Sequence, residues 1–263
     1  MKIDIYNEFV KRTATSLILF LLLIGLFFIG NNGIFLLVIV LSFLSFSEIN
    51  NLTNNKVKLK YFIPLLVLLY FFIIKSGILY PSDNLILVVF YSISSLLIIG
   101  SLFQKNNVHF SVIGLLINST LFSIIYIITN QNLEYKLIFI IITVISSCDI
   151  FAYLMGRRFG KFKIFPKISP NKTLEGYIGG SFCSLLLFSI IFLYLNLSNL
   201  YLILYLIIII ISSFIGDLYV SFFKRKLNIK DLGKLFPGHG GILDRIDSWL
   251  FSFPLSFLIL QLS

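Results

Sequence analysis

Long apolar runs dominate this sequence of 263 residues and restrict the folds open to it. A helix needs about 20 mostly apolar residues to cross the hydrocarbon core of a bilayer. Runs of this length recur from Ser16 onward, while only 12% of the residues are charged. A soluble domain has about a quarter of its residues charged, so this chain could not cover a water-exposed surface, and its surplus apolar surface must face lipid.

We predict an all-α fold, a polytopic transmembrane helix bundle of about nine spans. The expected spans are 13–30, 33–49, 61–79, 85–103, 110–128, 137–155, 177–195, 201–223 and 243–262. The third has the shortest uninterrupted apolar stretch because Lys75 lies inside it. A transmembrane barrel is disfavoured, since the runs are too long for its strands and lack polar alternation.

The first apolar run follows Lys2, Lys11 and Arg12 and in this respect resembles a signal peptide. No small-residue cleavage site follows it, so we expect a retained helix. Cys148 and Cys183 both lie inside apolar runs. They are expected to be small residues of membrane helices, and a disulfide framework or zinc site has no support.

Positive charge is distributed unevenly along the chain and predicts its orientation in the membrane. With a cytoplasmic N-terminus and alternating spans, all but two of the 21 Lys and Arg residues fall on the cytoplasmic side, the exceptions being Lys75 and Lys136. Cytoplasmic loops of membrane proteins carry such an excess. We therefore expect a multi-pass protein of the cell inner (plasma) membrane with an external C-terminus.

Two cytoplasmic segments, 157–172 and 224–245, are the long basic loops of the chain. A basic surface at membrane level suits an anionic lipid headgroup or a nucleotide. Nucleic acid is a poor partner, since neither loop interleaves aromatic residues with its charges. We expect one integrated membrane domain, with a motif-free region at 1–136 and the catalytic region, facing the cytoplasm, at 137–263.

Carboxylates inside spans are costly and usually functional. Asp149 lies in the sixth expected span and Asp217 in the eighth. A structural ion pair is the alternative explanation. Helical spacing groups polar residues with each carboxylate, and the three expected stripes are Asp149 with Tyr153 and Gly156, Asp217 with Ser221 and Lys224, and Asp244 with Asp247 and Ser248. Such stripes would be unstable against lipid, so they should line a shared wet cavity.

The glycine run from Gly238 to Gly241 leads into the expected ninth helix. Glycines let consecutive backbone N–H groups face an anion, and a helix N-terminus adds partial positive charge. His239 within this run is interpreted as a phosphate contact, with a capping or core residue as the alternative. Carboxylates nearby would repel phosphate without a cation, and hard oxygen ligands beside phosphate favour Mg²⁺ over zinc.

A second loop contains Ser169 and Pro170, which are typical of a helix N-cap and first turn. We expect a helix to start here. Aimed at the cavity, its N–H groups together with Ser169 and Lys172 would bind a phosphate.

Three elements make the resemblance to a known family specific. The stretch 221–247, with Ser221, Lys224, Arg225, Lys230, Asp231, the glycine run and Asp244-Arg245-Ile246-Asp247, resembles the signature of phosphatidate cytidylyltransferases, also called CDP-diacylglycerol synthases. The Ser-Pro-x-Lys-Thr-x-Glu-Gly stretch at 169–176 is similar to a second element of that family. A third is matched by Asp149, Ala152, Tyr153, Gly156, Arg157, Gly160 and Lys161.

The resemblance implies an Mg²⁺-dependent nucleotidyltransferase that acts on CTP and phosphatidate in the bilayer and gives CDP-diacylglycerol and pyrophosphate. A homodimer is a compatible assembly. The expected catalytic residues are Lys224, Arg225, Lys230, Asp231, His239, Asp244 and Asp247. The expected substrate contacts are Ser169, Lys172, Thr173, Ser221, Gly238, Gly240, Gly241, Arg245 and Asp149. The expected Mg²⁺ ligands are Asp217, Asp244 and Asp247.

Two other functions remain open at this point. The acceptor could be another membrane lipid phosphate, such as an isoprenoid or ether lipid, because lipid-facing residues select it. An anion transporter also uses carboxylates within the membrane and basic residues at the entrances of its pathway. Here, however, the polar residues cluster on one side of the membrane, and the other half of the chain has no corresponding set.

Overall fold

The computed structural model describes residues 17–18, 20–53, 59–75, 84–102, 108–129, 136–194, 200–233, 235–236 and 240–262. The predicted all-α fold is confirmed in these residues. The only extended pairings among them are two single bridges, Lys163 with Thr173 and Phe236 with Gly240. The assigned helices are α2 (Asn31–Thr53), α3 (Leu59–Lys75), α4 (Asn84–Leu102), α5 (Val108–Thr129), α6 (Lys136–Phe159), α7 (Leu174–Tyr194), α8 (Leu200–Lys226) and α9 (Trp249–Leu262).

Each expected span from the second to the ninth overlaps one of these helices. Five helical stretches are long and apolar enough to cross a membrane: Asn31–Thr53, Val108–Thr129, Lys136–Phe159, Leu174–Ile191 and Tyr201–Lys226. The apolar stretches of α3, α4 and α9 are shorter. Of the first expected span, residues 20–28 are helical and 13–16 lie outside the described residues. The membrane character is thus supported, whereas the count of nine spans stays a prediction.

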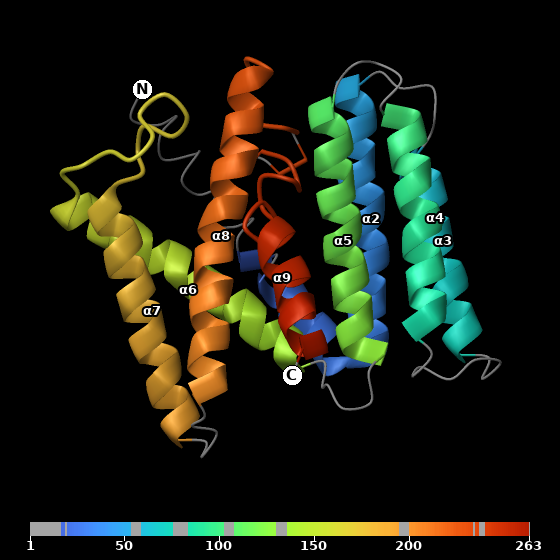
Figure 1. Ribbon diagram of the computed structural model, residues 1–263, viewed down its shortest axis with the longest axis horizontal. Helices are drawn as coiled ribbons and strands as arrows, with labels where there is room; N and C mark the ends of the chain where they lie inside the picture. The colour runs from blue at the N-terminus through green and yellow to red at the C-terminus, as the bar shows by residue number, and fades with distance from the viewer. Residues whose placement is uncertain are drawn as a thin grey trace. The chain divides into compact units, whose positions relative to one another are not determined.

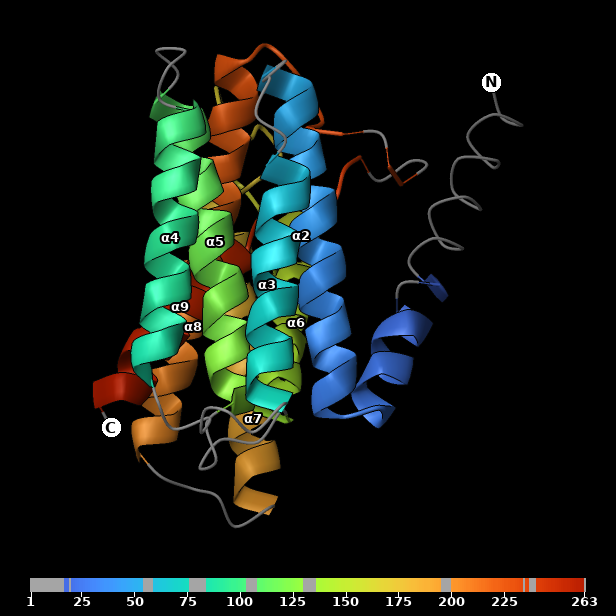
Figure 2. The same cartoon turned by 90° about the vertical axis from the view of Figure 1, so that its right-hand side faces the viewer.

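The chain divides into two compact units, of which the first comprises 1–137 and 230–246. In this unit α2 packs against α3 and α5, and α4 packs against the same two helices, which closes a ring of four (Figure 2). Apolar side chains such as Val38, Phe46 and Ile124 fill its centre with no exposed surface. A polar contact joins two neighbouring helices of the ring, because the Asn118 amide of α5 donates to Ser95 of α4 at 3.0 Å.

The second unit comprises 138–229 and 247–263. Here α8 packs against both α7 and α9, while α6 runs at a steep angle to α7 and α8 (Figure 1). Hydroxyl pairs join α8 to α9, since Tyr205 bonds Ser256 and Ser212 donates to Ser252. Such interhelical hydrogen bonds take the place of the hydrophobic effect, which does not drive helix association in lipid. The expected regions 1–136 and 137–263 stay a prediction, since compactness does not define a domain.

Small residues bring α6 and α7 close together inside the second unit. A Cβ on Gly180 would lie 2.7 Å from the Cβ and the backbone nitrogen of Ala152, and one on Gly176 would lie 2.8 Å from the Ala152 carbonyl oxygen. Small residues at such spacing let helix backbones approach in membranes. This contact places the start of α7 against the last turns of α6.

The expected helix start at Ser169 is wrong. Helix α7 begins at Leu174, and its N-cap is Thr173, whose hydroxyl accepts the N–H of Gly176 at 3.2 Å. The delay has a physical cause, because the chain at 172–174 first pairs with 162–164. In that pairing Ile164 N–H donates to the Lys172 carbonyl at 3.4 Å, and Leu174 N–H donates to the Phe162 carbonyl at 2.8 Å.

The expected ninth helix also starts later than the glycine run. Residues 242–248 form turns, and α9 begins at Trp249. Asp247 lies just ahead of the helix, where its Oδ1 accepts the N–H of Ser248 at 2.9 Å. Asp244, Asp247 and Ser248 therefore do not form one stripe on a helix, and the glycine run does not lead directly into a helix N-terminus.

Candidate active site

A partly open cavity of about 500 Å³ with several polar and charged residues in its wall lies in the second unit. Helices α6, α7 and α8 and the loop from 160 to 173 line it. Five residues expected from the sequence are in its wall: Asp149, Ser169, Lys172, Thr173 and Asp217. The volume falls within the range of about 300–1,000 Å³ that is usual for ligand sites.

The expected row on α6 lies along one side of this cavity. Asp149, Tyr153 and Gly156 all line it, as their spacing of four and seven residues predicts. Arg157, in the last turn of α6, also lines the cavity, so a cation lies at the C-terminal end of this row. The polar stripe on α6 therefore faces a cavity within the protein.

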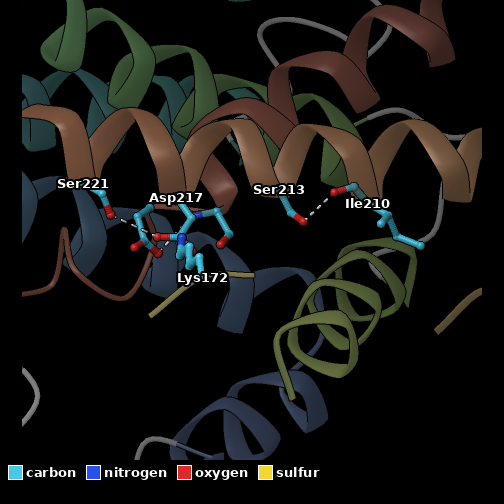
Figure 3. Close-up of polar contacts among 7 residues, drawn as sticks. Lys172, Ile210, Ser213, Asp217 and Ser221 are labelled. Atoms are coloured by element: carbon cyan, nitrogen blue, oxygen red, sulfur yellow. Dashed lines mark hydrogen bonds and ion pairs between the residues drawn. The ribbon is translucent and has the colours of Figure 1, made fainter. Parts of the chain in front are cut away.

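Opposite charges meet at Asp217 on α8. Lys172 Nζ forms an ion pair with Asp217 Oδ2, and the Ser221 hydroxyl donates to Asp217 Oδ1 at 3.5 Å (Figure 3). The second contact confirms that Asp217 and Ser221 share a face of α8. The first contact shows that the structural ion pair considered from the sequence is present, and it joins residues 45 positions apart.

A third carboxylate of this unit lies within electrostatic reach of the first two. Burial, followed by the charges of Asp217 and Asp149, raises the pKa of Asp247 well above its ordinary value. The N–H of Ser248 and the Lys224 ammonium act in the opposite direction without cancelling the rise. Mutual destabilisation of carboxylates is relieved when a cation binds among them.

The donor set of the cavity suits a hard cation. Asp149 and Asp217 offer carboxylate oxygens, and neither thiolate nor imidazole lines the cavity. Within the described part of the chain no group of three or more His, Cys, Asp or Glu is arranged to hold a metal ion. Protein Mg²⁺ sites commonly supply only one or two carboxylates, the rest coming from water and substrate phosphates, so the residues present fit Mg²⁺.

The other expected metal ligand, Asp244, belongs to the first unit. Its Oδ2 accepts two backbone hydrogen bonds of 2.9 Å each, from Leu232 and Gly241. The structure thus describes Asp217 and Asp247 in one unit and Asp244 in the other, and metal binding by all three stays a prediction. In this conformation, Asp244 joins the part of the 230–246 segment around Leu232 to the part around Gly241.

The glycine run adopts part of the backbone geometry expected of it. Gly240 has a φ of 78°, a conformation that a residue with a Cβ rarely adopts. Its carbonyl accepts the N–H of Phe236 at 2.9 Å, which closes a tight turn. Gly238 and His239, both expected to contact substrate, lie outside the described residues.

The other expected charged residues are in several different environments. Arg225, at the end of α8, donates from Nε to the Ile168 carbonyl at 3.1 Å and so holds the loop next to Ser169. Lys224 is half-buried on the same helix. Lys230, Asp231 and Arg245 are exposed in the first unit.

Tyr177 was not anticipated as a site residue. Its ring packs edge-on against Phe214 at 4.1 Å between centroids, and Lys172 Nζ lies 5.9 Å from its centroid. All three residues line the cavity. The Tyr177 hydroxyl is buried and has no hydrogen-bond partner in the described structure. Its position four residues after Thr173, the helix cap, is a sequence signal that could have identified it.

Glu48 was also missed. It is buried on α2 and accepts backbone N–H groups of Ile242 and Leu243. It lies inside the expected span 33–49, so the rule that drew attention to Asp149 and Asp217, a carboxylate within an apolar run, applies to it equally.

These features define a helical protein of membrane character with a cavity lined by carboxylate and cationic side chains. A family model described as "Cytidylyltransferase family" matches residues 10–263, and the chain belongs to this family. It is similar to the phosphatidate cytidylyltransferase of Staphylococcus haemolyticus, with 33% identity over 261 residues, 95% of this chain and 99% of the relative. Proteins of the same name are 41% identical in Staphylococcus saprophyticus, over 54% of this chain and 55% of the relative, and 43% identical in Staphylococcus aureus, over 53% and 54%.

Proposed function

We propose that this protein transfers CMP from CTP to phosphatidate, giving CDP-diacylglycerol and pyrophosphate. The observation that carries the proposal is its similarity, over almost the full length of both chains, to a protein named phosphatidate cytidylyltransferase. Family membership over residues 10–263 supports the same class of reaction. A lipid acceptor also agrees with a chain built of apolar helices.

In this reaction a phosphate oxygen of phosphatidate attacks the α-phosphorus of CTP. A new P–O bond forms while the bond from the α-phosphorus to the bridging oxygen breaks, and pyrophosphate carries away that electron pair. No protein nucleophile is needed, since the lipid phosphate is already ionised. Catalysis then consists of positioning the two phosphates and stabilising the charge that develops between them.

The cavity residues have distinct roles in this scheme. Lys172 offsets the charge of Asp217, which lowers the repulsion of an incoming phosphate. Arg157 adds positive charge to the same wall. Arg225 acts indirectly, because it holds the backbone at Ile168 and thereby the adjacent Ser169. Tyr177 offers an unpaired hydroxyl as a donor to substrate.

We propose that activity requires Mg²⁺, held by Asp217 and Asp247 with Asp244 as a further ligand. The influence of the Asp217 and Asp149 charges on Asp247 supports this role for the first two residues. The chemistry that the ion supplies when bound is neutralisation of charge on the transferring phosphate and the pyrophosphate. The three carboxylates would hold the ion, and Lys172 and Arg157 would offset charge on the remaining phosphate oxygens.

The reaction is proposed to occur at the cytoplasmic face of the inner (plasma) membrane. CTP is a cytoplasmic nucleotide, and the basic segments 157–172 and 224–245 fall on the cytoplasmic side of the expected topology. Assembly as a homodimer stays a prediction.

The test is a CTP-consumption assay on the detergent-purified protein with defined lipid acceptors. With α-labelled CTP and phosphatidate, we expect label in CDP-diacylglycerol and release of pyrophosphate, both abolished by chelating Mg²⁺. A preference for an isoprenoid phosphate over phosphatidate would identify the isoprenoid phosphate as the substrate instead. No CTP turnover with any lipid phosphate would refute the enzyme and leave anion transport, which requires sealed vesicles, as the function to test.

A further inference from the structure

Glu48 connects the motif-free part of the chain to the segment that carries the family signature. Its side chain is 6% exposed. Oε1 accepts the N–H of Ile242 at 2.7 Å and Oε2 accepts the N–H of Leu243 at 3.1 Å. These donors are 194 and 195 residues away along the chain. A carboxylate in an apolar helix is expensive to bury unless it is paired, and here two adjacent backbone donors satisfy it.

The segment 230–246 is packed around this carboxylate. A Cβ on either Gly233 or Gly241 would overlap the Glu48 carboxylate, and one on Gly233 would also lie 3.0 Å from the Gly241 Cα. A side chain at either position would therefore force the Glu48 carboxylate to move away from its backbone partners. The parts of the segment around Gly233 and Gly241 therefore meet at Glu48 on α2.

A second carboxylate completes the arrangement. Asp244 accepts the N–H groups of Leu232 and Gly241. Together, Glu48 and Asp244 engage the consecutive N–H groups of Gly241, Ile242 and Leu243, which from the sequence alone would be candidates for binding substrate phosphate. In this structure those donors fix the shape of the segment instead.

We propose that Glu48 is a positioning residue for the reaction, holding residues 240–246 so that Asp244 and Arg245 are presented in one fixed geometry. The kinetic part of this inference rests on the proposed function, whereas the anchoring part does not. A carboxylate is needed because both of its oxygens accept, while an amide would turn an NH₂ group toward one of the two N–H donors. Glu48→Gln is therefore a nearly isosteric variant that breaks one of the two contacts.

Hydrogen exchange on the purified full-length protein tests the anchor without any substrate. In Glu48→Gln we expect faster amide exchange in peptides covering Ile242 and Leu243, with peptides of α8 unchanged. Ser45→Ala is the matched control, since this buried residue lies one turn earlier on α2 and its hydroxyl donates only within that helix, to Leu41 and Ser42. Exchange in Glu48→Gln equal to that of wild type would overturn the anchor.

Steady-state kinetics test the positioning role. We expect Glu48→Gln to lower kcat by roughly 10- to 100-fold, the range that misplaced catalytic groups produce, with a KM for CTP changed less than about threefold, as for an interaction that matters mainly in the transition state. Glu48→Asp should restore part of the loss. Faster exchange with unchanged kcat would overturn the positioning role, whereas wild-type protein without CTP turnover would refute the proposed function and leave the anchor standing.

A double-mutant cycle provides a test that does not depend on Glu48→Gln alone. Gly241→Ala should be damaging because its methyl group meets the Glu48 carboxylate. Glu48→Ala removes that obstacle, so the double variant should be about as active as Glu48→Ala by itself. Losses that simply multiply would show that the two positions act independently and would contradict the proposal.

Discussion

At the scale of single residues, the site is governed by carboxylates that need partners. Asp217 has Lys172, Asp244 has two backbone N–H groups, and Glu48 has two more. Asp247 has Lys224 nearby but still lies among like charges. Asp247 is thus the carboxylate of this group for which a bound cation would bring the largest relief.

Replacing Asp217 by Asn should lower kcat by about 100-fold or more, the scale seen when one key electrostatic group is removed. The amide keeps the size and the contact with Ser221 but loses the charge that pairs with Lys172 and that is proposed to bind Mg²⁺. Ser213→Ala is a control on the same helix, because the Ser213 hydroxyl donates only to its own helix at Ile210, at 2.8 Å (Figure 3). Near-normal activity of Asp217→Asn at normal membrane levels would remove Asp217 from the metal site.

Asp244→Asn separates metal binding from the structural role of this residue. The Asn side-chain oxygen can still accept from Leu232 and Gly241, so the segment should keep its shape. We expect a kcat loss of about 100-fold with hydrogen exchange at residues 240–246 close to wild type. An unchanged rate, or a dependence on Mg²⁺ concentration identical to that of wild type, would assign Asp244 a structural role alone.

At the scale of elements, α6 and α7 approach each other closely at residues that include part of the cavity wall. Ala152 on α6 meets Gly176 and Gly180 on α7. The same two helices carry Asp149 and Tyr177 into the cavity wall. Since helix backbones cannot interpenetrate, any added bulk at this contact must move one helix against the other.

Gly180→Ala tests this dependence. Its methyl group would lie 2.7–2.8 Å from Ala152 atoms that include the backbone, so α6 or α7 must shift. We expect kcat to fall by roughly 10- to 100-fold through misplaced groups, together with a lower Tm. Gly100→Ala on α4 is the matched control, since its Cβ would meet nothing within 4 Å. Equal effects of the two substitutions would show that the α6–α7 contact does not set the site.

At the scale of the whole molecule, charge and apolar length together define how the chain lies in a bilayer. Five stretches of helix are long enough to span. Helix α9 has 14 residues, about 21 Å at 1.5 Å per residue, which is shorter than the roughly 30 Å hydrocarbon core. The 221–247 segment lies before α9, and its cytoplasmic placement depends on the number of spans that precede it.

Reporter fusions at the two termini test the topology. The basic asymmetry predicts a cytoplasmic N-terminus and an external C-terminus. A reporter active only in the cytoplasm should therefore work at residue 1 and fail at residue 263. Both termini on one side would contradict the odd number of spans, whereas reversed sides would contradict the orientation and the cytoplasmic site.

Much of the site's chemistry follows from local sequence. Asp149, Tyr153 and Gly156 share a cavity wall, and Asp217 contacts Ser221, because α-helical geometry repeats every 3.6 residues. The residues at which helices begin were harder to predict from the sequence. Ser169 with Pro170 has the composition of a helix start, but pairing of 172–174 with 162–164 delays the helix to Leu174, and only the folded loop brings those residues together.

The sequence by itself determined that this chain is a helical membrane protein of a nucleotidyltransferase family, since apolar length, charge asymmetry and motif spacing are properties of short stretches. Only the tertiary structure decided which groups partner those motifs. Lys172 meets Asp217 across 45 residues, and Glu48 meets Ile242 across 194. Each of these contacts depends on how separate helices pack, and neither helical periodicity nor residue composition specifies which distant donor will satisfy a buried carboxylate.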